Sequence, residues 1–269
     1  MASVLTHQEL DDYFGSYVGM DGGNPEAPIW FCDPSRNSSF ERLVTPLQPK
    51  TMPPAWDAEF RVQHRDEMEK WLMHQRIARI MTATRADALG IPLGENDWQS
   101  YYWNRLYAPN GAEFKLSLFP MPLNLTGSTS WSQVFRGQPA LVPKHRYLDL
   151  CRQGARFRFL AWICARWRPK VVVCFGHRYT EDFRRAFVLD EVAGEDQQLR
   201  PADLVTPLRV FVRDSTTWVI CPAMAGSSGL TSNVQLDAFG KWLGARVERS
   251  DFESHTANGG GVRLALEPS

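Results

Sequence analysis

Ile29-Trp30-Phe31-Cys32-Asp33-Pro34-Ser35-Arg36 is an apolar run that changes at an Asp-Pro pair into a polar, cationic segment. The run predicts a buried strand over about residues 27–32. Such a strand delivers its last residues to the carboxyl edge of a parallel sheet, where open α/β folds bind ligands. Pro34 fixes its own φ and lacks an N–H donor, so the turn after Asp33 is expected to be stiff. Asp33 is therefore a candidate for chemistry.

Three further strands are predicted at the centre of the fold. Residues 114–119 alternate apolar and polar side chains up to Pro120, and residues 170–176 are β-branched and uninterrupted. Residues 208–213 and 217–221 predict a hairpin whose second arm joins the main sheet. Four loops are then expected to leave the carboxyl ends of four strands.

Helical patterns separate these strands. They cover residues 7–17, 55–83 (with one break), 144–168 (as one or two helices), 177–188 and 234–246. The alternation predicts an α/β fold whose strands pair in parallel through right-handed crossovers. Residues 1–248 are predicted to form a single domain, and residues 249–269, which are poor in packing residues, a flexible C-terminal tail.

The composition limits the class of protein. The chain has 269 residues, 43% hydrophobic, and its thirty basic residues balance thirty acidic ones, so binding to nucleic acid would need a local patch. No secretory pattern and no apolar run of the ~20 residues that span a bilayer occurs, which predicts a cytoplasmic protein without a membrane partner. Basic residues gather between the second and third strands: Arg136, Lys144, His145, Arg146, Arg152, Arg156, Arg158, Arg166, Arg168 and Lys170.

The cysteines indicate reduced thiols. There are five of them, Cys32, Cys151, Cys164, Cys174 and Cys221, without a Cys-x-x-Cys pair. An odd number without metal-ligand spacing predicts neither a disulfide framework nor a zinc site. We expect no metal and no cofactor.

Two short motifs lie at strand ends: Phe31-Cys32-Asp33-Pro34-Ser35-Arg36, and residues 221–228, Cys-Pro-Ala-Met-Ala-Gly-Ser-Ser. In these motifs the chain resembles the uracil-DNA glycosylase superfamily. The first resembles the family motif in which a strand ends at Gly-x-Asp/Asn-Pro and the Asp or Asn positions the attacking water, and the second is similar to the family motif that is often His-Pro-Ser followed by small residues. The similarity in order and spacing extends over about residues 17–243. It implies a three-layer α/β/α sandwich with a central, mainly parallel four-stranded sheet.

Two departures from the family pattern matter. The glycine two places before the acid is Phe31, and the histidine of the second motif is Cys221, which removes a group that can stabilise the departing base. Gly19-Met20-Asp21-Gly22 also fits a Gly-x-Asp pattern, although no apolar strand precedes it. Asp21 is therefore a rival to Asp33 as the catalytic acid.

The resemblance implies roles for residues around these motifs. Pro34 and Ser35 follow the acid, Phe40 takes the place of the family's stacking aromatic, and Ser117 or Asn124 lies where the family reads the base edge. Candidate DNA contacts are Arg36, Cys221, Met224, Gly226, Ser227 and Ser228. Small residues let backbone amides approach a phosphate, and an apolar side chain such as Met224 can act as a wedge in the base stack.

The function implied is a monofunctional DNA glycosylase, expected to be a monomer, that flips out a base and hydrolyses its N-glycosidic bond. The base stays open between uracil, mismatched thymine and a modified pyrimidine such as a phage-modified cytosine. Ser35 and Arg36 stand where uracil enzymes use a tyrosine to exclude large C5 substituents. The alternatives are a catalytically inactive nucleic-acid-binding module of the same fold and an unrelated α/β hydrolase using Cys221 or Ser227, although residues 225–229 lack the G-x-S-x-G pattern.

Overall fold

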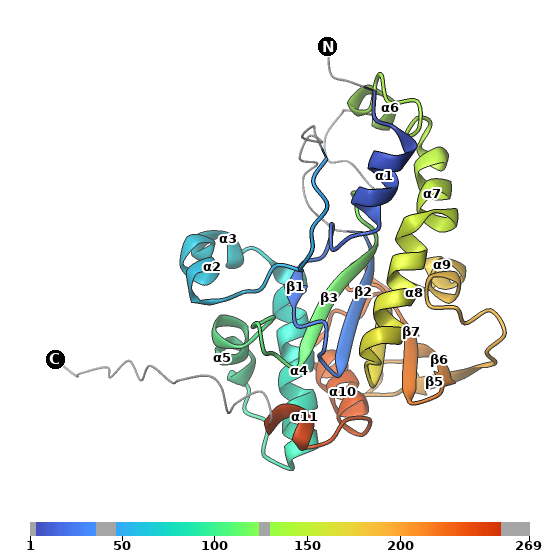
Figure 1. The fold of residues 1–269 in the computed structure, drawn as a ribbon. Helices are drawn as coiled ribbons and strands as arrows, with labels where there is room; N and C mark the ends of the chain where they lie inside the picture. Colours follow the sequence, from blue (N-terminus) through green and yellow to red (C-terminus); the bar gives the residue numbers. More distant parts are fainter. Residues whose placement is uncertain (1–3, 36–46, 124–129, 254–269) are drawn as a thin grey trace.

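The computed structural model describes residues 4–35, 47–123 and 130–253. These residues form a seven-stranded mixed sheet in the order β1-β3-β2-β4-β7-β6-β5 (Figure 1). The strands are β1 (Gly22–Gly23), β2 (Ile29–Ser35), β3 (Glu113–Phe119), β4 (Val171–Phe175), β5 (Gly194–Leu199), β6 (Thr206–Arg213) and β7 (Thr216–Cys221). The fold is therefore α/β, as the sequence predicts.

The four central strands are parallel. β2 pairs with β3 on one side and with β4 on the other, and β4 pairs with β7. The prediction of a sheet with only four strands is wrong, because β1, β6 and β5 extend it with antiparallel pairs. β5 has the sequence Gly-Glu-Asp-Gln-Gln-Leu, and a polar edge strand of this kind gives no hydrophobic signal.

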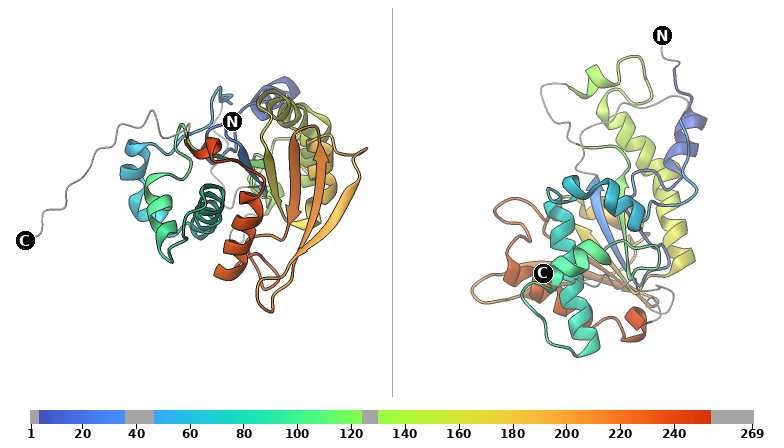
Figure 2. Two further views of the ribbon diagram at one scale, coloured as in Figure 1. Left: turned by 90° about the horizontal axis from the view of Figure 1, so that it is seen from below. Right: turned by 90° about the vertical axis from the view of Figure 1, so that its left-hand side faces the viewer.

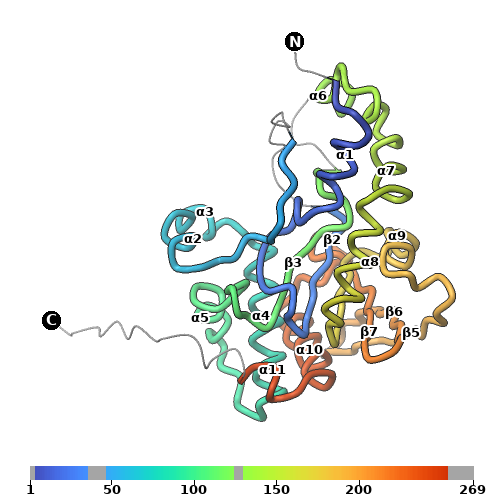
Figure 3. Tube along the Cα trace, viewed as in Figure 1, coloured from blue at the N-terminus to red at the C-terminus, as the bar shows by residue number. Residues whose placement is uncertain are grey.

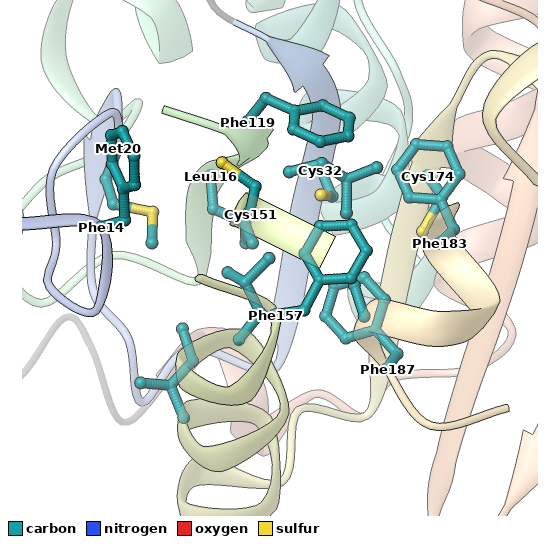
Figure 4. Packing of buried hydrophobic residues seen from close by; sticks show 14 of the residues in the cluster. Phe14, Met20, Cys32, Leu116, Phe119, Cys151, Phe157, Cys174, Phe183 and Phe187 are labelled. Atoms are coloured by element: carbon teal, nitrogen blue, oxygen red, sulfur yellow. The ribbon is translucent and has the colours of Figure 1, made fainter. Parts of the chain in front are cut away.

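Helices cover both faces of the sheet (Figure 2). On one face, Trp30, Cys32 and Leu116 join a buried cluster beneath the helices that precede and follow β4; Figure 4 shows part of this cluster. On the other face, Ile29, Phe31 and neighbours on β4 and β7 join a second cluster. The helices of the first face are α1 (His7–Phe14), α7 (Lys144–Gln153), α8 (Ala155–Trp167) and α9 (Thr180–Ala186), and those of the second are α4 (Leu72–Leu89), α5 (Asp97–Asn104) and α10 (Asn233–Gly244).

Short helices complete the chain. They are α2 (Ala58–Gln63), α3 (Arg65–Met68), α6 (Trp131–Val134), the 3-10 turn η1 (His177–Tyr179) and α11 (Ser250–Glu253). The continuous trace in Figure 3 shows α1 beside α8, although the two helices are distant in the sequence, and contacts between them support this.

Several predicted boundaries move. β2 does not break at Asp33 but continues to Ser35, and its pairing with β4 ends at Cys32, where the missing N–H of Pro34 is tolerated. The helical pattern over residues 55–83 divides into three helices, and the last of them extends to Leu89, where Gly90 in the left-handed region ends it. The pattern over residues 144–168, predicted as one or two helices, forms two, α7 and α8, on either side of Gly154.

The start of the predicted tail packs against the domain. Phe252 of α11 is buried, and Asp251 accepts a hydrogen bond of 2.9 Å from Lys170. The prediction of a flexible tail from residue 249 is therefore wrong for residues 250–253. Residues 254–269 lie outside the described part of the chain.

Candidate functional site

Asp33 lies near the carboxyl end of a central parallel strand. It is the register partner of Ser117 on β3, and its side chain shares the sheet face of Ile29 and Phe31, since side chains alternate along β2. Only 5% of Asp33 is exposed. The sequence therefore brings a carboxylate to the edge where a ligand would be expected, but inside the protein rather than on its surface.

A buried lysine holds this carboxylate. Lys115 Nζ lies 2.5 Å from Asp33 Oδ2 and 3.2 Å from Asp21 Oδ2, and it also donates to the carbonyl of Leu116 at 3.2 Å. Lys115 has no exposed surface. The two rival acids of the sequence analysis thus contact one ammonium group, which forms a buried triad of two carboxylates and one cation.

Sequence reasoning missed Lys115. The signal was the alternation in β3, where Glu113, Lys115 and Ser117 occupy one face of a strand that is buried along its whole length. Three polar side chains on such a face need polar partners, because an unpaired charge in the protein interior is costly. Glu113 has its own partners, since Tyr101 Oη donates to it at 2.6 Å and the backbone N–H of Tyr107 at 2.7 Å.

The loop before β1 positions Asp21. Its backbone N–H donates to the carbonyl of Lys115 at 3.1 Å, and its carbonyl accepts from Trp56 Nε1 at 3.2 Å. Gly19, at φ +72°, packs so tightly on Pro120 that a Cβ there would lie 2.5 Å from the proline Cα. Only glycine fits this close approach, which fixes the loop against the end of β3.

Arg156 ties the same loop to the sheet from the opposite face. It is fully buried and donates to the carbonyls of Ser16 and Val18 in the loop, and to those of Ser117 and Leu118 on β3. Arg156, one of the basic residues predicted to form a patch, is therefore structural.

Burial and charge act against each other at the triad. Burial raises the pKa of Asp33 above its ordinary value, the ammonium of Lys115 lowers it, and the charge of Asp21 raises it again. Burial alone would lower the pKa of Lys115, but the charges of Asp33 and Asp21 together raise it. Lys115 is therefore held in its protonated form.

Ser117 adds a hydroxyl beside the carboxylate. Its side chain is fully buried, and its Oγ has no hydrogen-bond partner among the described residues. Buried hydroxyls are nearly always satisfied by protein, water or a ligand. Between the two predicted base readers, Ser117 is the one that the structure describes; Asn124, Arg36 and Phe40 lie outside the described residues.

The strand ends around Asp33 converge. The hydroxyl of Ser35 accepts from the backbone N–H of Leu123 at 3.2 Å, which joins the end of β2 to the segment after β3. Gly176, at φ +108° after β4, donates to the carbonyl of Cys221 at 2.8 Å and lies beside the ring of Pro34. The carboxyl ends of β2, β4 and β7 therefore meet at one rim.

The second motif divides into a buried and an exposed half. Cys221 and Met224 are buried, and the Met224 carbonyl accepts a hydrogen bond from Arg76. Gly226, Ser227 and Ser228 are exposed, with Gly226 at φ +81°. A wedge role for Met224 would require the side chain to leave the core, whereas the exposed half is free to contact a ligand.

Few of the predicted basic residues face this rim. Arg152 forms a pair with Asp182 at 2.7 Å, and Lys170 lies at the opposite end of β4. Lys144, at the start of α7, donates to the carbonyl of Leu123. Burial lowers the pKa of Lys144, and the charge of the exposed Arg178 lowers it further. In the described part of the chain, the cations near the strand ends include Lys144, Arg178 and Arg76.

The large cavities that border the helices of the first face lie elsewhere. One of about 930 Å³ lies between α1 and α8, one of about 770 Å³ between α1 and α7, and one of about 720 Å³ between α9 and the β5–β6 edge; Asp33 lines none of them. Within the described ranges, no three His, Cys, Asp or Glu side chains are placed to hold a metal ion. No helix in that part of the chain is long and apolar enough to cross a membrane.

The five thiols are buried and unpaired. Burial raises the pKa of Cys221 well above its usual range, and the charge of Asp33 adds to this effect.

Comparison with protein-family models, with curated proteins and with solved structures finds no match to this chain.

Proposed function

We propose that the protein is a monofunctional DNA glycosylase that flips a nucleotide out of DNA and hydrolyses its N-glycosidic bond, leaving an abasic site. It would act as a monomer in the cytoplasm. In this proposal the four central parallel strands correspond to the sheet of the uracil-DNA glycosylase superfamily, and β1, β5 and β6 are additions to it.

One observation carries the proposal. The acid of the Asp-Pro motif is a buried carboxylate near the end of a central parallel strand, next to a buried hydroxyl that has no partner among the described residues. A fixed anion with a second polar group beside it can support the hydrolysis of a nucleoside bond. Its transition state carries positive charge on the sugar.

The proposed reaction uses few groups. Asp33 opposes the developing charge on the sugar and orients a water molecule. The bond between C1′ and the base nitrogen breaks, and its electron pair leaves with the base. The water oxygen bonds to C1′, its proton passes to Asp33 and then to solvent, and the departed base takes a proton from solvent.

The surroundings favour a pyrimidine larger than uracil. Ser35 is small, is only half-buried, and uses its hydroxyl to accept from Leu123 at the position where the resemblance places a tyrosine in uracil enzymes. A serine in place of that tyrosine would not exclude the methyl group of thymine or a larger substituent such as that of a modified cytosine. For the DNA backbone, the exposed Gly226–Ser228 segment and the cations Lys144 and Arg178 are the candidate contacts.

Alkaline strand cleavage tests the proposal. Duplex and single-stranded oligonucleotides that carry uracil, mismatched thymine or a modified cytosine are incubated with wild type, Asp33→Asn, Asp21→Asn and Glu113→Gln. The last is the matched control, a buried carboxyl on β3 that contacts Tyr101 rather than the triad. We expect Asp33→Asn to lose on the order of 10²- to 10⁴-fold in rate and the control to lose little. Full activity in Asp33→Asn with loss in Asp21→Asn would assign the reaction to the rival acid.

A specific observation also favours an inactive nucleic-acid-binding module. Asp33 is bound by Lys115 at 2.5 Å and is almost completely buried, as in a purely structural ion pair. Binding to DNA without abasic-site formation on any of these oligonucleotides, at enzyme in excess over DNA, would support that function.

The hydrolase alternative has less support. The Cys221 thiol is buried and its pKa is raised, whereas an activated nucleophile needs access and a lowered pKa. Ser227 lies on an exposed turn. Labelling of Cys221 or Ser227 by a thiol- or serine-directed probe, with loss of a measured activity, would revive this alternative.

A further inference from the structure

The ammonium of Lys115 joins three segments of the chain. It extends from the middle of β3 to Asp33 on β2 and to Asp21 in the loop before β1, and it has no contact with solvent. A lysine is rarely placed in this way unless its charge is needed, because removing an ammonium from water is costly even when it is paired. Its two partners are the two acids that the sequence singles out.

We infer that Lys115 is a positioning residue, whose ammonium keeps the Asp33 carboxylate in place and in its charged form, and that Asp21 limits this effect as a second carboxylate on the same ammonium. The role of Lys115 in catalysis rests on the proposed function, in which Asp33 is the catalytic acid.

The two partners act on Asp33 in opposite directions. Lys115 carries the opposite charge at 2.5 Å and lowers the pKa of Asp33, whereas Asp21 carries the same charge and raises it. Burial raises it as well. The charge state of Asp33 is therefore set by a balance that two single substitutions can move in opposite senses.

Among the described residues, few other titratable or charged groups act on Asp33. The side chain of Tyr107 is fully buried, burial and the charges of Asp21, Glu113 and Asp33 raise its pKa, and its hydroxyl lies 3.2 Å from Nδ1 of His74 on α4. The thiols of Cys32 on β2, Cys174 on β4 and Cys221 on β7 also interact with the charge of Asp33, and burial raises the pKa of each thiol. The charges that shift the pKa of Asp33 most are those of Lys115 and Asp21.

The same geometry excludes Lys115 as a nucleophile. An amine must lose its proton to attack the sugar, and two carboxylates stabilise the protonated form. The triad therefore fits hydrolysis by water rather than a covalent lysine intermediate.

The test measures the titration of Asp33 directly. The protein is labelled with ¹³C at the aspartate carboxyl carbons, and the Asp33 resonance is assigned from its disappearance in Asp33→Asn. It is then titrated in wild type, Lys115→Met, Asp21→Asn and the control Glu113→Gln. We expect the midpoint to move up by about one pH unit or more in Lys115→Met, to move down in Asp21→Asn, and to stay in place in Glu113→Gln.

Midpoints that stay in place, or that move in the same direction in both triad variants, would overturn the inference. If Lys115→Met does not fold, as circular dichroism would show, Asp21→Asn alone decides, because that substitution is isosteric and keeps Lys115 in place. In an active enzyme the acid limb of kcat/KM should move in the same directions as the midpoints, a response that a purely structural role would not give.

The proposed glycosylase function and the positioning role of Lys115 can be contradicted separately. Opposite shifts of the Asp33 titration without abasic-site formation on any oligonucleotide would overturn the proposed function and leave the charge balance intact. Abasic-site formation that depends on Asp33, with a titration that ignores Lys115 and Asp21, would overturn the inference and leave the function intact.

Discussion

Asp33 and Ser117 are register partners in the parallel pair of β2 and β3, so the carboxylate and the hydroxyl leave neighbouring strands side by side on one face of the sheet. Adjacent strands are about 4.8 Å apart, which brings both groups within reach of one small molecule or one base edge. Ser117 has no hydrogen-bond partner among the described residues, and Lys115, two residues earlier on the same strand, holds Asp33.

Ser117→Ala is expected to separate function from stability. Because the hydroxyl gives up no protein hydrogen bond, the free energy of unfolding should change by less than about 1 kcal/mol. If the hydroxyl orients water or the base, kcat/KM for abasic-site formation should fall by about tenfold or more. Urea unfolding and glycosylase assays measure the two quantities. Lower stability with unchanged kcat/KM would show that the hydroxyl serves the fold alone.

Arg156→Met is expected to be strongly destabilising. The guanidinium donates to four carbonyls that join the Asp21 loop to β3, and their removal leaves buried acceptors without partners. The free energy of unfolding should fall by about 3 kcal/mol or more, measured by urea unfolding. Arg158→Met, on the same helix with a side chain 69% exposed, is the control and should change it by no more than about 0.5 kcal/mol. Equal effects of the two substitutions would contradict this role.

Glu113 should make the stability depend on pH. Burial raises the pKa of Glu113 to about 7 from an ordinary value of 4.5. The folded state therefore binds this proton more tightly, and the resulting stabilisation is complete below about pH 4.5 and is lost as the pH rises through 7. Over this range the free energy of unfolding of the wild type should fall by about 3 kcal/mol relative to Glu113→Gln. A difference between the two proteins that stays constant with pH would show that another group titrates.

The triad should behave as a unit when its members are replaced. Lys115→Met leaves two carboxylates buried without their cation and should lower the free energy of unfolding by about 3–5 kcal/mol. Adding Asp21→Asn and Asp33→Asn removes those charges and should restore most of the loss. Urea unfolding of the single and triple variants gives the comparison. A triple variant as unstable as the single one would mean that Lys115 acts through packing and not through its charge.

Much of the fold could be predicted from the sequence because buried parallel strands are continuous apolar runs. β4, with the sequence Val-Val-Val-Cys-Phe, and the end of β7 are of this kind, and their order along the chain predicts the crossovers. β5 could not be predicted, because a polar edge strand is defined by its pairing with β6 and not by its own composition. The end of β2 was misplaced for a related reason, since the pairing of Ser35 with Phe119 carries the strand past Pro34.

The site could be predicted only in part. The Asp-Pro motif identified Asp33 and the Gly-x-Asp pattern identified Asp21, but nothing in either motif indicates that both acids reach one lysine. That contact depends on the register between β2 and β3 and on the loop that Arg156 and Gly19 hold in place. Lys115 was visible only as one polar position in an alternating strand.

Abasic-site formation by wild type and by Asp33→Asn, with enzyme in excess over DNA that carries uracil, mismatched thymine or a modified cytosine, tests the central claim most directly. The account predicts alkali-labile sites on at least one of these substrates with the wild type. It predicts a loss on the order of 10²-fold or more in Asp33→Asn, with its fold and DNA binding retained. Equal rates for the two proteins on every substrate that is cleaved would contradict it.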